Sequence, residues 1–124
     1  MAIIQSITTC FRFNNQAEDA VKFYTSTFKN SRIKKIALYG GTACEPHSKQ
    51  PETVMTIVFE LSGQTFLAIN TGVDSKFNEA ISLQVYCNNQ EELDYYWEAL
   101  SEGDGKREQQ SGWLQDKFGI SWQI

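Results

Sequence analysis

Cys10 and Arg12 lie two residues apart and are the first side chains of this 124-residue chain that could do chemistry together. If residues 3–13 form a β-strand, both side chains point to the same face. A neighbouring guanidinium lowers the pKa of a thiol, and the thiolate is the form that attacks electrophiles. Cys10 is therefore a candidate nucleophile, and Glu60, in a later predicted strand, is a candidate general base. The structural alternatives are a small half-buried thiol and a solvated carboxylate on an edge strand.

The single histidine, His47, does not support a metal site or a catalytic triad. It follows Cys44 in residues 40–52, which contain both prolines of the chain and almost no apolar residue. We predict an exposed loop there. Two ligands in such a loop are too few for a tetrahedral site, and a triad would need the histidine in a cleft. The three cysteines show no Cys-x-x-Cys spacing, so neither a disulfide framework nor a zinc knuckle is indicated.

Composition argues against several kinds of partner. The formal net charge is −4 and the only basic cluster is short (Arg32, Lys34 and Lys35), so we predict no nucleic-acid partner. No apolar run approaches the length of a membrane span or resembles a signal peptide, so we expect no membrane partner and a cytoplasmic location. No Walker loop and no Gly-x-Gly-x-x-Gly motif is present, and we expect no cofactor.

A repeat organises the whole chain. Residues 7–18 and 81–92 match at one constant offset (81 − 7 = 74), and Asn-Asn-Gln-x-Glu falls at the same place in both. An alternating run that suits a strand precedes each Asn-Asn pair, and a helical pattern follows it. A supersecondary unit that occurs twice suggests a module that stacks on its own copy.

Both copies predict the element order βαβββ. The first copy predicts a helix and strands at residues 3–13, 15–28, 32–39, 53–61 and 64–70. In the second copy the predicted helix is at residues 89–100 and three strands are placed, at residues 81–87, 107–114 and 119–124, so one strand of the βαβββ order is not placed. Asn15 and Asn89 are the expected helix N-caps, each with a glutamate three residues later. The expected fold is α+β, a single domain of two βαβββ modules (residues 1–72 and 73–124) that form a cupped mixed sheet.

The apolar stripe of each helix needs an apolar sheet face, so the polar side chains of the strands fall on the opposite face, which we call the open face. On this face we expect Thr8, Cys10, Arg12, Glu60 and Asn70 in the first module. In the second module we expect Ser82, Gln84, Tyr86 and Gln123, with Trp113 as a wall. Two such faces curled toward each other would enclose a small-molecule cavity. The alternative is that they simply face water on half-buried sheets.

Three features together resemble the vicinal-oxygen-chelate superfamily of glyoxalase I, bleomycin-resistance proteins and extradiol dioxygenases. They are the paired βαβββ unit, Ala-Val-Lys-Phe-Tyr-x-x-x-Phe at residues 20–28, and Gly-Trp-Leu-x-Asp-Lys-Phe-Gly-Ile-Ser-Trp-Gln-Ile at residues 112–124. Within it the chain is similar to the PhnB-like branch, often labelled 3-demethylubiquinone-9 3-methyltransferase-like. The resemblance covers essentially the whole chain and implies the two-module fold and a homodimer.

The metal enzymes of this superfamily hold one divalent ion with His or Glu on the first and last strand of each module. The resemblance carries these four places onto Thr8, Asn70, Ser82 and Gln123. Neutral hydroxyl and carboxamide oxygens are weak ligands for such ions. We therefore expect no metal, although the fold inference is unaffected.

The predicted function is metal-independent binding of a small molecule between the sheets, with Arg12 favouring an anionic one. The expected ligand-binding residues are Thr8, Arg12, Asn70, Ser82, Gln84, Tyr86, Trp113 and Gln123. The alternative is an enzyme of the glyoxalase, dioxygenase or methyltransferase-like type, using a weakly held divalent metal or using Cys10 or Glu60.

Overall fold

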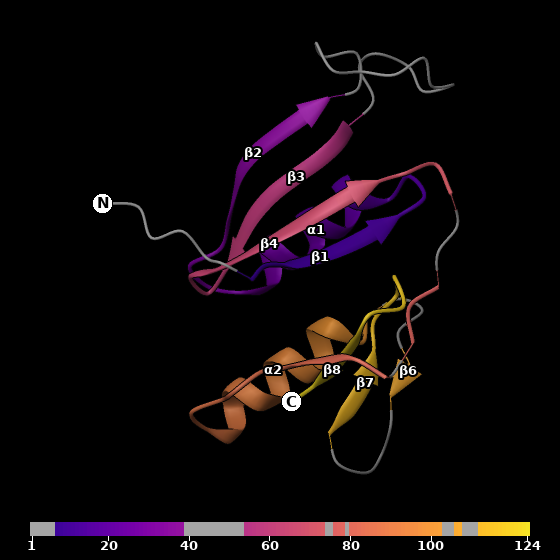
Figure 1. The fold of residues 1–124 in the computed structure, drawn as a ribbon. Helices are drawn as coiled ribbons and strands as arrows, with labels where there is room; N and C mark the ends of the chain where they lie inside the picture. The colour runs from indigo at the N-terminus through magenta and orange to yellow at the C-terminus, as the bar shows by residue number, and fades with distance from the viewer. Residues whose placement is uncertain (1–6, 39–53, 74–75, 79, 103–105, 108–111) are drawn as a thin grey trace. The chain divides into compact units, whose positions relative to one another are not determined.

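The chain folds as two compact units, residues 1–75 and 76–124 (Figure 1). The structure is a computed structural model that describes residues 7–38, 54–73, 76–78, 80–102, 106–107 and 112–124. The break between the units lies three residues beyond the predicted module boundary. His47 and Cys44 fall outside the described residues.

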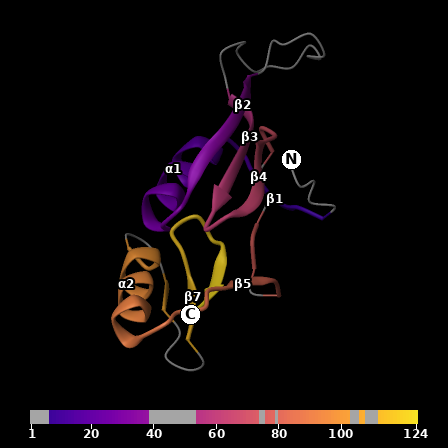
Figure 2. The same ribbon diagram turned by 90° about the vertical axis from the view of Figure 1, so that its left-hand side faces the viewer.

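The first unit is a four-stranded mixed sheet with one helix against it. Its strands run in the order β1-β4-β3-β2, with β1 parallel to β4 and the other pairs antiparallel. The helix α1 covers one face of this sheet (Figure 2). The elements are β1 (Thr9–Phe13), α1 (Ala17–Thr27), β2 (Arg32–Leu38), β3 (Val54–Leu61) and β4 (Gln64–Asn70).

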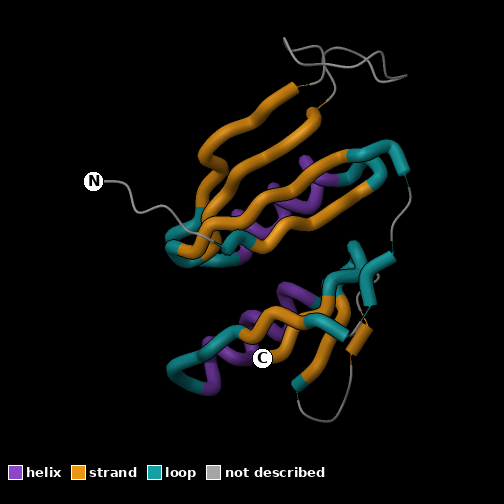
Figure 3. The backbone as a smooth tube through the Cα atoms, in the orientation of Figure 1, coloured by secondary structure: helices purple, strands orange, loops and turns teal. Residues whose placement is uncertain are grey.

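The second unit repeats this topology strand for strand. Its order is β5-β8-β7-β6, again with the first and last strands parallel, which confirms the duplicated βαβββ module and the α+β class (Figure 3). The elements are β5 (Ser82–Gln84), α2 (Gln90–Leu100), β6 (Lys106–Arg107), β7 (Trp113–Gln115) and β8 (Ser121–Gln123).

The predicted single strand at residues 107–114 is wrong. Its ends belong to two strands, because Arg107 is the last residue of β6 and pairs antiparallel with Leu114 of β7. Gly112, directly before β7, has a φ of 68° and lies in the left-handed region, which ends an extended run. An alternating pattern read across this glycine joined two separate strands.

Aromatic rings fill the core of the first unit. Phe66 stacks on Phe11 and on Phe59 with ring centroids 5.8 and 5.7 Å apart, and Phe11 also contacts Tyr24 of α1. All four residues are buried. The buried apolar stripe of α1 consists of Ala17, Ala20, Val21 and Tyr24, and the C-cap residue Phe28 is buried as well. Packing of this stripe onto β1, β3 and β4 therefore decides which face of the sheet is buried.

The two helices are capped differently. The side chain of Asn89 accepts a hydrogen bond from Glu92 N at 2.8 Å, as predicted for α2. The equivalent prediction for Asn15 is wrong, because Gln16 occupies the N-cap of α1 and makes no side-chain cap bond. The amide of Ala17 instead donates to Asn70 Oδ1 at 2.9 Å, so the first turn of α1 is satisfied from β4.

The turn between β7 and β8 is built around a buried carboxylate. Asp116 is 3% exposed, and its Oδ1 accepts hydrogen bonds from the backbone amides of Phe118 and Ile120. Its Oδ2 accepts from the indole Nε1 of Trp122 at 2.8 Å. Gly119 completes the turn with a φ of 95°. These bonds explain the spacing Asp116-x-Phe118-Gly119-x-x-Trp122, which ties the last strand to the strand before it.

Replacement of Asn70 by Ala should lower the free energy of unfolding by about 1–3 kcal/mol, because it leaves the buried Ala17 amide and the Val54 carbonyl without their partner. Urea denaturation measures this change. Asn15→Ala is the matched control and should stay within about 0.5 kcal/mol of the parent. A larger loss for Asn15→Ala than for Asn70→Ala would contradict the assignment of the cap.

Replacement of Gly112 by Ala in the second unit should destabilise the protein more than replacement of Gly63 by Ala in the first. A Cβ at Gly112 would lie 2.5 Å from the Ile124 carbonyl oxygen, whereas a Cβ at Gly63 has nothing within 4 Å. Both positions have positive φ, so both substitutions carry a conformational cost of about 1–2 kcal/mol. Only Gly112→Ala adds a steric clash with the backbone of Ile124. Equal melting temperatures for the two variants would exclude this clash.

Candidate functional site

The open face of the first sheet is defined by strand register, since residues paired across neighbouring strands point to the same side. One row of neighbours runs from β1 to β2 through Arg12, Ile69, Thr56 and Ala37. The next row contains Cys10, Leu67, Val58 and Lys35. A third row contains Thr65, Glu60 and Arg32. The predicted placement of Cys10, Arg12 and Glu60 on this face is confirmed.

Asn70 lies on the opposite face, so its predicted place on the open face is wrong. It is 2% exposed, with its Oδ1 bound to Ala17 N and its Nδ2 donating to Val54 O. It follows the buried Phe66 and Ala68 at the two-residue period of β4. The open-face positions of this strand are therefore Thr65, Leu67 and Ile69.

Cys10 lacks the activation that the sequence predicts. Cys10 as a whole is exposed. Its thiol is partly buried, and the resulting desolvation raises the pKa of the thiol above the ordinary value. This direction is opposite to the lowering by Arg12 that a nucleophilic Cys10 would need, and it favours the alternative of a structural thiol. A raised pKa leaves Cys10 almost entirely protonated at neutral pH, which disfavours a nucleophilic role.

Glu60 forms ion pairs with two basic side chains. Its Oε1 lies 3.3 Å from Arg32 Nε and its Oε2 lies 3.8 Å from Lys34 Nζ. A bulge in β2 between Ile33 and Lys35 interrupts the register beside Glu60. A carboxylate held between two basic side chains serves as a cross-strand tie, and this arrangement disfavours its use as a general base.

Thr8 is exposed and lies directly before β1 rather than within it. Its predicted equivalent in the second copy, Ser82, is the first residue of β5. Thr8 therefore lies next to the edge strand β1, but it is outside the paired residues of β1 and β4 that include Arg12.

The open face of the second sheet gathers neutral hydrogen-bonding side chains. Register places Ser82 and Gln84 of β5 beside Ser121 and Gln123 of β8. Trp113 of β7 pairs with Gln123 and so shares this face. Tyr86 follows β5, is 83% exposed, and donates a hydrogen bond from its hydroxyl to Gln84 Oε1 at 3.2 Å. The structure thus brings five predicted site residues together, which are Ser82, Gln84, Tyr86, Trp113 and Gln123.

Sequence reasoning missed Gln115, which pairs with Ser121 on the same face. Its Nε2 donates to the Gly119 carbonyl at 3.1 Å, so it links the open face to the Asp116 turn. The spacing of two residues from Trp113 was the signal that could have revealed it.

The four places that the resemblance assigns to a metal do not fit a divalent ion in this chain. Thr8, Ser82 and Gln123 offer only neutral oxygens, and Asn70 points into the core with its amide bound to backbone groups. Zn²⁺, Ni²⁺ and Fe²⁺ prefer imidazole, thiolate or carboxylate donors. Within the part of the chain that the structure describes, no three His, Cys, Asp or Glu side chains come together.

Alkylation of Cys10 by iodoacetamide should be slower at pH 7.4 than that of glutathione, because the raised pKa lowers the thiolate fraction. The rate should rise with pH to a midpoint above the ordinary thiol value of about 8.5. A Cys44→Ser/Cys87→Ser variant isolates this thiol, and mass spectrometry follows its modification. A midpoint below pH 8 would restore Cys10 as a nucleophile.

Comparison with known families and structures agrees with this geometry. The profile of the family described as 3-demethylubiquinone-9 3-methyltransferase matches residues 5–124. A comparison with proteins of curated function gives no match. Within the described ranges, neither helix is long and apolar enough to cross a membrane.

Three solved structures are similar to this chain. The putative 3-demethylubiquinone-9 3-methyltransferase, PhnB protein, from Bacillus cereus is 37% identical over 96% of this chain and 97% of its own, with a TM-score of 0.79. Protein PA1353 from Pseudomonas aeruginosa is 16% identical over 96% and 95%, with a TM-score of 0.76. A glyoxalase/bleomycin resistance protein from Albidiferax ferrireducens T118 is 15% identical over 95% of each chain, with a TM-score of 0.58. The chain therefore belongs to the 3-demethylubiquinone-9 3-methyltransferase family, in the PhnB-like branch of the vicinal-oxygen-chelate superfamily.

Proposed function

We propose that this protein binds a small molecule without a metal, through side chains on the open faces of its two sheets. The observation that carries the proposal is the grouping on β5, β8 and β7, where carboxamides and hydroxyls share one face with Trp113. Carboxamides both donate and accept hydrogen bonds, and an indole offers a broad apolar surface. Such a set can orient a polar ligand without supplying or removing a proton.

The ligand that we propose is anionic, because Arg12 places a permanent positive charge on the open face of the first sheet. The guanidinium presents paired donors that match a carboxylate or phosphate. Thr8 lies nearby in sequence and adds a hydroxyl at the edge of the same sheet. The predicted homodimer remains part of this proposal.

We do not propose the methyl transfer in the family's description. Adenosyl and dinucleotide cofactors are commonly held by a glycine-rich connection between a strand and the following helix. The connections here are Asn14-Asn15-Gln16 and residues 85–89, and neither contains glycine. Both helix N-termini already donate a backbone hydrogen bond to a capping side chain, Asn70 for α1 and Asn89 for α2. These residues do not fit an S-adenosylmethionine site.

An enzyme that uses Cys10 or Glu60 is the weaker candidate. The raised pKa of Cys10 and the two cations beside Glu60 both favour structural roles. No observation in the described residues favours a metal-dependent reaction over binding.

A thermal-shift screen of a metabolite library should find compounds that raise the melting temperature, and the shift should persist in EDTA. Ligand binding to the native state alone raises the melting temperature. Gln84→Leu or Gln123→Leu should weaken binding of such a compound about fivefold, the effect of one lost neutral hydrogen bond of about 1 kcal/mol.

Gln90→Leu is the matched control for this screen. Gln90 belongs to α2 and its side chain donates to Asp94 on the helix surface, away from the strands. Affinity should be unchanged in this variant. A shift that disappears in EDTA would favour a metal site, and a library without any stabilising compound would overturn the proposal.

A further inference from the structure

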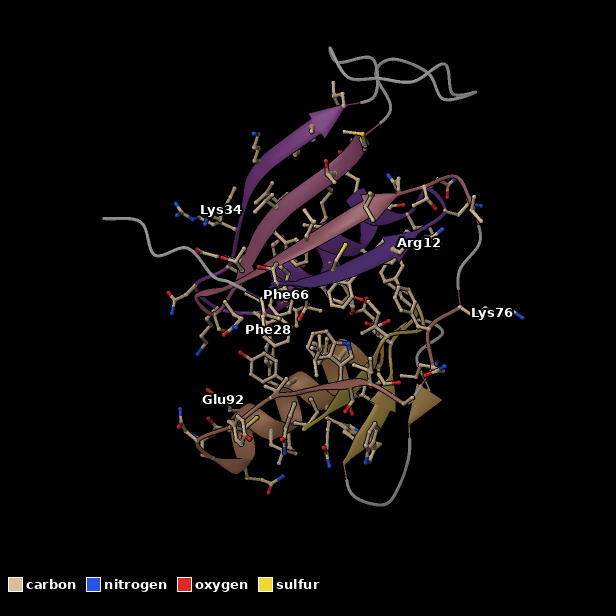
Figure 4. All side chains as sticks on the ribbon, viewed as in Figure 1. Arg12, Phe28, Lys34, Phe66, Lys76 and Glu92 are labelled. Atoms are coloured by element: carbon tan, nitrogen blue, oxygen red, sulfur yellow. The ribbon has the colours of Figure 1, made fainter. Side chains whose placement is uncertain are left out.

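The open face of the first sheet has an apolar centre between basic edges. Leu67 and Ile69 of β4 and Val58 of β3 lie side by side at its middle, each half-buried. Arg12 extends the row of Ile69 to one edge strand, and Lys35 extends the row of Val58 to the other. Arg12 on β1 and the basic residues of β2, among them Lys34, thus lie at opposite edges of the sheet (Figure 4).

The charge of this face is opposite in sign to that of the chain. Strand register and ion pairing assign four cations to it (Arg12, Arg32, Lys34 and Lys35) and one carboxylate, Glu60. Its formal charge is +3, whereas the whole chain carries −4. Glu60 is already held by Arg32 and Lys34. Among the described residues, no carboxylate lies within 4.0 Å of the charged groups of Arg12 or Lys35.

From this arrangement we infer that the ligand of the first sheet is an amphipathic anion, a carboxylate with an aliphatic or aromatic body. Its carboxylate binds Arg12, and its body lies across Ile69, Leu67 and Val58. The inference rests on the proposed function, since it assigns a chemical class to the ligand of one open face. It goes beyond a charge preference, because it requires the apolar body as well.

Each half of such a ligand matches one part of the face. A small hydrophilic anion would leave the half-buried Leu67 and Val58 uncovered, and a neutral apolar molecule would lie beside a guanidinium without compensating it. Arg12 is the expected partner of the head group because its planar fork donates two parallel hydrogen bonds. Lys35 lies three strand spacings away, about 14 Å across the sheet, and in a different row, so Arg12 is the nearer partner of a carboxylate placed in the row of Ile69.

Calorimetric titration of the full chain with octanoate tests the inference. Octanoate should bind at least tenfold more tightly than octanol, which has the same body without charge, and than acetate, which has the charge without the body. Arg12→Gln should weaken octanoate about tenfold or more, the usual effect of one lost charge-assisted contact. Leu67→Gln should weaken octanoate by a similar factor and leave acetate unchanged.

Arg32→Gln is the matched control, because it removes a cation of the same face that is already paired with Glu60. Octanoate affinity should change by less than about threefold. Arg12→Lys keeps the charge without the fork and should fall between the parent and Arg12→Gln, so it tests the inference should Arg12→Gln fail to fold by circular dichroism.

Equal affinity for octanoate and octanol, no effect of Arg12→Gln, or no octanoate binding would overturn the inference. If octanoate does not bind but a library compound binds and is weakened by Gln84→Leu, only the inference of an amphipathic anion is overturned. Failure of both overturns the proposed function as well.

Discussion

The parallel pairing of the first and last strand of each module is the constraint on which the rest of the structure depends. It joins β1 to β4 and β5 to β8 across long stretches of sequence. Since side chains alternate along a strand, one residue of slip would exchange the buried and open faces. The register therefore decides that Gln84 lies beside Gln123 and that Arg12 lies beside Ile69. Asn70 and Asp116 each anchor the last strand of a module by buried hydrogen bonds.

Much of the fold was predictable because several elements carry their own signal. In β3, buried Ile57 and Phe59 alternate with half-buried Thr56 and Glu60, and the predicted open-face position of Glu60 is confirmed. The Ser62-Gly63 turn was equally clear, and both residues have positive φ. In β4, by contrast, Phe66, Leu67, Ala68 and Ile69 form a continuous apolar run, so polarity alone could not identify its two faces. A polar Asn70 at its end was therefore assigned to the wrong side.

Tertiary contacts explain the remaining errors. Asn15 has the local sequence of an N-cap, but β4 places an amide where α1 needs an acceptor, and the distant residue prevails. The sequence around Asn15 gives no indication of the hydrogen bond between Ala17 and Asn70. The same is true of Cys10, whose pKa depends on its partial burial rather than on the arginine two residues away. For the candidate site, residue types were predictable, whereas their grouping required the register of the sheets.

The two modules share a topology but have diverged in the chemistry of their open faces, one basic and apolar, the other rich in neutral amides. The basic face has a consequence for kinetics as well as for affinity. Because the chain carries −4 and this face +3, the remaining residues carry a formal −7. An anionic ligand of the proposed kind would be repelled by the acidic remainder of the chain and attracted to the basic face, so its association would be faster. Added salt would screen this attraction and slow the association, even if the contacts in the bound state were unchanged.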